Sequence, residues 1–138
     1  MIIDAKNMIA GRIATVAAKN AILGEDIIIV NSESAIITGK KQFLVSEYTR
    51  RKEQGTFKGP FLPKMPDRFL KRLIRGMLPY KKEKGSTALE RIKCYIGVPA
   101  EFADKEIVKI ENADMKKLDN RNYMNIGDIC KKIGWKGK

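Results

Sequence analysis

The feature that most constrains the fold is the apolar, β-branched run inside Asp26–Asn31, which reads Ile-Ile-Ile-Val. Because no polar residue alternates with the apolar ones, this run predicts a strand that is covered on both faces. The preceding segment Gly11–Leu23 has apolar residues at three- and four-residue spacing and is followed by Gly24, so it predicts a helix. With Met1–Asp4 as a first strand, these elements predict a strand–helix–strand unit, which is normally right-handed.

The rest of the chain predicts more elements of both kinds and one domain covering residues 1–138. Strands are expected at Lys93–Val98 and Glu106–Ile110, helices at Lys40–Lys52, Asp67–Leu78, Gly85–Arg91 and Gly127–Ile133, and a short element with a turn at Ser34–Gly39. The alternation of strands and helices predicts a layered α/β domain with a mainly parallel sheet of about four strands. A basic insertion of helices and loops, residues 40–93, lies between the second and the third strand of this sheet.

The positive charge of the chain is concentrated in this insertion. Of a net charge of +12, +11 falls within Lys40–Lys93, which holds sixteen Lys and Arg against five Asp and Glu. Such a concentration repels itself unless a polyanion neutralises it, and nucleic acid is the commonest polyanion. The helix expected at Asp67–Leu78 has four cations on one face with no carboxylate between them, namely Arg68, Lys71, Arg72 and Arg75. We therefore predict that this face contacts phosphate groups.

The composition argues against most catalytic sites. The chain has no His, which removes Ser-His-Asp triads, histidine metal centres and the usual general base. Cys94 and Cys130 are expected to be reduced, half-buried thiols, and two Cys alone cannot form a zinc site. The longest apolar run is far below the ~20 residues that span a bilayer, and the N-terminus lacks signal-peptide features. We predict no catalysis, cofactor, metal, membrane or small-molecule substrate.

Three glycine-containing segments have more than one interpretation. Gly39-Lys40 does not fit a P-loop, because the motif needs Gly at position 34 and Ser or Thr at position 41. Gly11-Arg12 fits either a phosphate site at a helix N-terminus or simple helix initiation. In Gly55–Pro66, a loop with two Gly and three Pro, Phe57 and Phe61 either stack on unpaired RNA bases or anchor the loop. Anchoring is slightly favoured, and Trp135 is expected to be a packing anchor.

Several short segments occur in an order and spacing that resembles one protein family. They are Ala10–Ala14, Ile29–Glu33 with Ile36–Gly39, Lys58–Pro60, Met65–Arg68, Arg75–Pro79 and Arg91–Pro99. This pattern, which extends over residues 1–135, is similar to the ribosomal protein L13 family of the large subunit in its archaeal and eukaryotic-type branch. The Arg-Gly-Met-Leu-Pro segment is the most specific part.

The resemblance implies a three-layer α/β/α fold and a structural role in the cytoplasmic ribosome. The implied partners are large-subunit ribosomal RNA and neighbouring ribosomal proteins, in a ribonucleoprotein that serves ribosome assembly and translation. The RNA-binding candidates carried over from it are Arg12, Lys40, Lys41, Lys58, Lys64, Arg68, Arg72, Arg75, Lys81, Lys82, Lys84 and Arg91. Four more, Arg50, Arg51, Lys52 and Lys71, rest on charge alone. The alternatives are an enzyme acting on a nucleotide or RNA end and a DNA-binding architectural protein.

Overall fold

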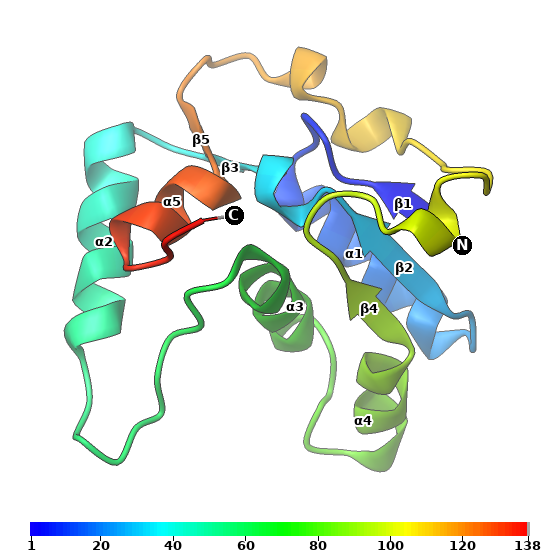
Figure 1. Ribbon diagram of the computed structural model, residues 1–138. Helices are drawn as coiled ribbons and strands as arrows, with labels where there is room; N and C mark the ends of the chain where they lie inside the picture. The colour runs from blue at the N-terminus through cyan, green and yellow to red at the C-terminus, as the bar shows by residue number, and fades with distance from the viewer. Residues whose placement is uncertain (138) are drawn as a thin grey trace.

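The computed structural model describes residues 1–137, which form a mixed α/β fold. Figure 1 shows the parallel sheet with α1 and α4 on one side of the molecule, α2, α5, β3 and β5 on the other, and α3 between them. The elements, in order, are β1 Ile2–Asp4, α1 Ala10–Ile22, β2 Ile27–Val30, β3 Ile36–Thr38, α2 Lys41–Glu53, α3 Pro66–Gly76, α4 Glu83–Glu90, β4 Ile92–Cys94, β5 Tyr123–Asn125 and α5 Ile126–Lys132.

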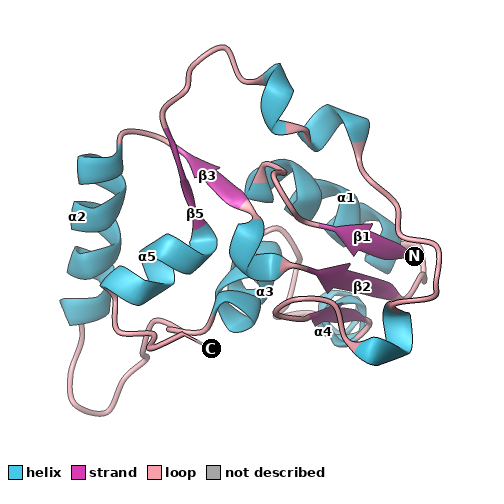
Figure 2. Cartoon of the chain, turned by 45° about the horizontal axis from the view of Figure 1, so that its top comes forward, coloured by secondary structure: helices cyan, strands magenta, loops and turns pink. Residues whose placement is uncertain are grey.

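The buried strand predicted at Asp26–Asn31 is the centre of the main sheet. Its three strands run parallel in the order β1-β2-β4, with Ile29 of β2 opposite Ile3 on one side and Cys94 on the other. Ile27 and Ile29 have no exposed surface. Figure 1 places α1 on one face of this sheet and the short 3-10 helix Ala100–Phe102 on the opposite face, and Figure 2 shows α1 from a second angle. The α/β fold class with a mainly parallel sheet is confirmed.

The sheet prediction differs from the structure in several details. The main sheet has three strands instead of about four, and the strand expected at Lys93–Val98 is Ile92–Cys94. The strand expected at Glu106–Ile110 does not form, and only Val108 makes an isolated parallel bridge, to Ile3. Most side chains of this segment are exposed, so no second face of apolar contacts extends the pairing. The short element around residues 34–39 contributes β3, whose antiparallel partner β5 was not predicted. A three-residue strand is too short to show a periodic pattern.

Helix α3 lies at the centre of the helical packing. It contacts α1, α5 and β4, and its apolar side chains Phe69, Leu70 and Ile74 are buried. The buried side of α1 is rich in alanine, and such small side chains allow neighbouring elements to pack closely against the helix. The ring of Phe69 also lies 5.1 Å from the ring of Tyr48 on α2. This packing determines which face of α3 remains at the surface.

Gly85 in α4 provides a test of this packing. A Cβ atom at this position would overlap the carbonyl group of Pro79, because the first turn of α4 lies directly against the preceding loop. We expect Gly85→Ala to destabilise the fold by about 1–3 kcal/mol or more, through overpacking. In the control Gly11→Ala, also in a helix, no atom lies within 4 Å of the added methyl group. Thermal unfolding should show a lower Tm only for Gly85→Ala, and equal Tm values for both variants would contradict the packing.

Candidate nucleic-acid interface

The cationic face predicted on residues 67–78 is formed by α3. Pro66 starts the helix with its preset backbone angle, and Asp67 in the first turn complements the positive end of the helix dipole. Because the apolar residues of α3 face the core, its cations are left on the opposite side. The amphipathic pattern thus positions the charges without any contribution from a ligand.

The four cations of α3 lie side by side at the surface. Together with Pro63 and Leu89 they line one shallow depression, and they are Arg68, Lys71, Arg72 and Arg75. Within residues 1–137, none of them forms an ion pair with a carboxylate. Arg68 and Arg72 are exposed, whereas the guanidinium of Arg75 lies 4.7 Å from the centre of the Tyr80 ring. We name these four residues the α3 cationic face.

The cations at the end of α2 are held differently. Nη2 of Arg50 lies 2.8 Å and Nε of Arg51 lies 2.9 Å from the same oxygen of Glu47. Hydrogen bonds from Arg50 and Arg51 lower the pKa of the Glu47 carboxyl. Arg51 also lies 5.4 Å from the ring centre of Tyr48. An RNA phosphate would therefore compete with Glu47 for these two side chains, which makes them weaker candidates than Arg68 and Arg72.

Two other predicted site residues make contacts within the fold. Nη1 of Arg12 donates a hydrogen bond to the carbonyl of Asn112 at 2.6 Å. Half-buried Arg91 donates from Nη1 to the carbonyl of Ala21 at 3.4 Å, near the end of α1. Both side chains connect distant parts of the chain, so each has a structural contact besides its predicted role at RNA. The Gly11-Arg12 segment does start α1, as both of its interpretations require.

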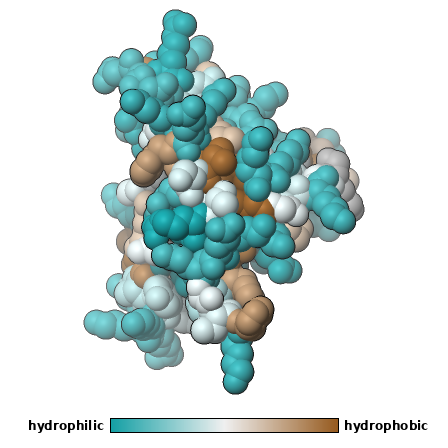
Figure 3. Space-filling view, turned by 90° about the vertical axis from the view of Figure 1, so that its left-hand side faces the viewer, coloured by the Kyte–Doolittle hydropathy of each residue, from teal (hydrophilic) through white to brown (hydrophobic). Residues whose placement is uncertain are grey.

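The remaining candidates are exposed lysines on the segments around α2, α3 and α4. Lys40 and Lys41 stand at the start of α2, Lys81 and Lys82 lie between α3 and α4, and Lys84 is in the first turn of α4; Lys58 and Lys64 are in the loop before α3. Figure 3 shows the side that carries α2 covered mostly by hydrophilic side chains. All these residues stay predicted RNA contacts.

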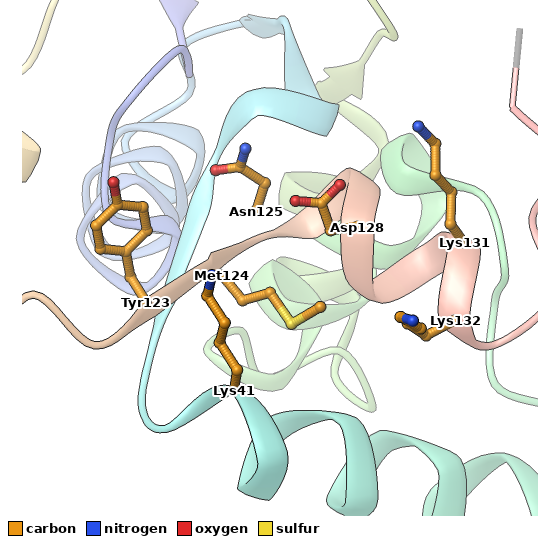
Figure 4. Close-up of a pocket in the computed structure, with 7 residues that line it drawn as sticks. All are labelled: Lys41, Tyr123, Met124, Asn125, Asp128, Lys131 and Lys132. Carbon is orange, nitrogen blue, oxygen red and sulfur yellow. The ribbon is translucent and has the colours of Figure 1, made fainter.

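The structure places two lysines that the sequence prediction did not include near Lys41. Lys131 and Lys132 of α5 line a pocket with Lys41, and Tyr123, Met124, Asn125 and Asp128 complete its lining. Figure 4 shows these side chains gathered from α2, β5 and α5. Both lysines lie outside the segment of concentrated charge, so only the packing of α5 near α2 brings them to Lys41. The signal in the sequence was a Lys pair in the last turn of a short helix.

The interpretation of the loop aromatics as anchors is wrong. Phe57 is fully exposed, at 103% of its reference surface, and Phe61 is 68% exposed. Neither ring packs into the core, because the loop between α2 and α3 extends away from the helices (Figure 1). Trp135, in contrast, is partly buried and packs against the hydrophobic core, which confirms its predicted role.

The two cysteines are free thiols, as predicted, but the expected half-buried position is correct only for Cys94. Cys130 has no exposed surface and Cys94 is partly buried. Burial raises the pKa of both thiols to about 12. Residues 1–137 hold no cluster of three or more His, Cys, Asp or Glu that could bind a metal ion. None of the helices in this part of the chain has the length and apolar character needed to cross a membrane.

The fold and the α3 cationic face describe a small, basic α/β protein of the kind that binds a polyanion. A family model described as "Ribosomal protein L13" matches residues 1–101. A large ribosomal subunit protein uL13 from Methanosarcina barkeri is 45% identical over 137 residues, covering 98% of each chain. The corresponding protein of Methanococcoides burtonii is 44% identical over 136 residues, again covering 98% of each.

The chain belongs to the ribosomal protein L13 family. A more distant relative, from Methanopyrus kandleri, is 40% identical and covers 97% of this chain and 86% of its own length. The family resemblance predicted from short segments is thus confirmed over nearly the whole chain. Membership also confirms that the chain is not an enzyme, since the family consists of ribosomal proteins.

The raised pKa values of the thiols lead to a test of their burial. At pH 8, a thiol with a pKa near 12 is thiolate in only about one molecule in ten thousand, and the thiolate is the reactive form. We expect iodoacetamide to modify Cys94 and Cys130 at least about 100-fold more slowly in the folded protein than in urea. Mass spectrometry measures the rates, and rapid modification of the folded chain would contradict the described burial.

Proposed function

We propose that this protein is a structural constituent of the large ribosomal subunit that binds large-subunit ribosomal RNA and supports subunit assembly and translation. The observation that carries the proposal is the α3 cationic face, whose charges have no carboxylate partner within residues 1–137. The relatives named as large ribosomal subunit proteins support it. The proposed location is the cytoplasmic ribosome, next to other ribosomal proteins.

Binding would work through phosphate contacts and the release of counterions. Each Lys or Arg that neutralises a phosphate releases condensed cations into solution, which favours association at low salt. The guanidinium of Arg68 or Arg72 can hold two phosphate oxygens at once, because its donors lie in a planar fork. The buried face of α3 holds the helix in place, so its cations are already arranged before RNA arrives. Such contacts read the shape of folded RNA more than its sequence.

Family membership has already excluded the enzyme alternative, and the DNA-binding alternative can be tested by experiment. An enzyme would need a nucleotide loop or an acid–base pair, and a nucleotide would raise its melting temperature. A DNA-binding architectural protein would prefer duplex DNA over structured RNA in a competition assay. Family membership argues against the DNA-binding alternative too, because the relatives are named as ribosomal proteins.

Reversing the charge of the α3 cationic face tests the site. We expect Arg68→Glu combined with Arg72→Glu to weaken binding to deproteinised large-subunit rRNA at least about tenfold. The slope of log affinity against log salt should fall by about 2, since two phosphate contacts are lost. Both side chains are exposed, so the fold should be retained. Filter binding at several salt concentrations measures both quantities.

The matched control separates this site from the effect of net charge. Lys19→Glu combined with Lys109→Glu changes the net charge equally, at exposed positions on α1 and on the loop after β4. We expect this control to bind much more tightly than the α3 variant. Equal loss in both variants would mean that general charge, not the α3 cationic face, determines binding.

Sedimentation tests the proposed location. We expect the tagged protein, in native cell extract on a sucrose gradient, to migrate with the large subunit and to stay there in moderate salt. Many simultaneous phosphate contacts, combined with contacts to neighbouring proteins, resist partial screening. Free protein at the top of the gradient at low and moderate salt would contradict the proposal.

A further inference from the structure

The loop between α2 and α3 presents an aromatic ring at its tip. Thr56 and Gly59 form an isolated bridge, and the N–H of Gly59 donates to the carbonyl of Thr56 at 3.1 Å. The turn therefore places Phe57 and Lys58 at its end. Gly59 has a φ of +90°, which suits glycine, and an added Cβ would lie 3.2 Å from Cε2 of Phe61. The Phe61 ring thus folds back against Gly59, while Phe57 points away from the protein.

Because Phe57 is not buried, its side chain adds no hydrophobic stabilisation to the fold. Its surface is 103% exposed, whereas Phe69 and Phe102 are only 2% and 7% exposed. A phenyl ring gains free energy when it leaves water, and here none of that gain is realised within the chain. Single exposed apolar residues are common, so exposure alone carries no conclusion. The surroundings of the ring decide what could cover it.

These surroundings are cationic. Residues 54–66 hold Lys58 and Lys64 and no Asp or Glu, and the loop leads directly into α3 with Arg68 in its first turn. At its other end it follows the last turn of α2, where Arg50 and Arg51 are paired with Glu47 and Lys52 stands next to Glu53. A partner that covers Phe57 must therefore accept an aromatic face and several cations together. Unpaired RNA meets both requirements, since each nucleotide has a flat base and a phosphate.

We propose that Phe57 stacks on an unpaired base of large-subunit ribosomal RNA while Lys58 contacts a neighbouring phosphate. This inference rests on the proposed function and deepens it, because it assigns the loop to a single-stranded nucleotide rather than to a helix. Bases within a duplex have both faces covered by neighbouring pairs, so a ring at a loop tip finds no free face there. The α3 cationic face needs only phosphates and can bind paired or unpaired RNA.

Substitutions at Phe57 test the stacking contact. We expect Phe57→Ala to weaken binding to deproteinised large-subunit rRNA about 5- to 150-fold, the usual effect of losing one stacked ring. Phe57→Tyr should bind about as tightly as wild type, because it keeps the aromatic face. The salt slope should not change, since no charge is lost. Binding of Phe57→Ala to a fully paired RNA duplex should equal that of wild type.

The control is Leu23→Ala, which removes another exposed apolar side chain, 72% exposed, just after the end of α1. It should bind rRNA like wild type, and thermal unfolding should show that all variants are folded. Normal rRNA binding by Phe57→Ala, with loss of binding by the Arg68→Glu and Arg72→Glu variant, would overturn the stacking contact and leave the proposed function intact. If Phe57→Ala bound rRNA normally but dissociated from assembled large subunits, the ring would contact a neighbouring protein instead of RNA. Failure of wild type to bind rRNA would overturn both proposals.

Discussion

The structure depends on the burial of the apolar face of α3. Phe69, Leu70 and Ile74 are enclosed between α1, α5 and β4, so this helix joins the parallel sheet to the β3–β5 side of the molecule. Hydrophobic burial is not directional, but a helix that buries one face must expose the opposite one. Packing the apolar face of α3 into the core therefore also places Arg68 and Arg72 at the surface.

The tertiary structure divides the cations of this chain into two kinds. Arg12 and Arg91 donate hydrogen bonds to backbone carbonyls of distant segments, and Arg50 shares Glu47 with its neighbour. Within residues 1–137, the cations of α3 have no such acceptor, so their charge remains available at the surface. Because both kinds carry the same charge, composition alone cannot separate them.

The sequence predictions were correct where the underlying interaction is local along the chain, and wrong where it depends on distant residues. The central strand and α3 were predictable, because their patterns reflect local geometry with one or two faces to bury. Glu106–Ile110 was wrongly predicted as a strand, since only Val108 in this segment pairs with β1, at Ile3, and one bridge does not make a strand. Phe57 was wrongly taken as an anchor, because hydrophobicity indicates a tendency to be buried and not the path of a loop.

The sequence by itself determined the α/β class, the amphipathic character of α3, the concentration of positive charge and the family. These are properties of neighbouring residues or of ordered short segments, so they can be read along the chain. Only the tertiary structure decided which cations are free, that Lys131 and Lys132 line one pocket with Lys41, and that Phe57 stands outside the core. Contacts between residues far apart in the chain depend on how the elements pack, which no local pattern encodes.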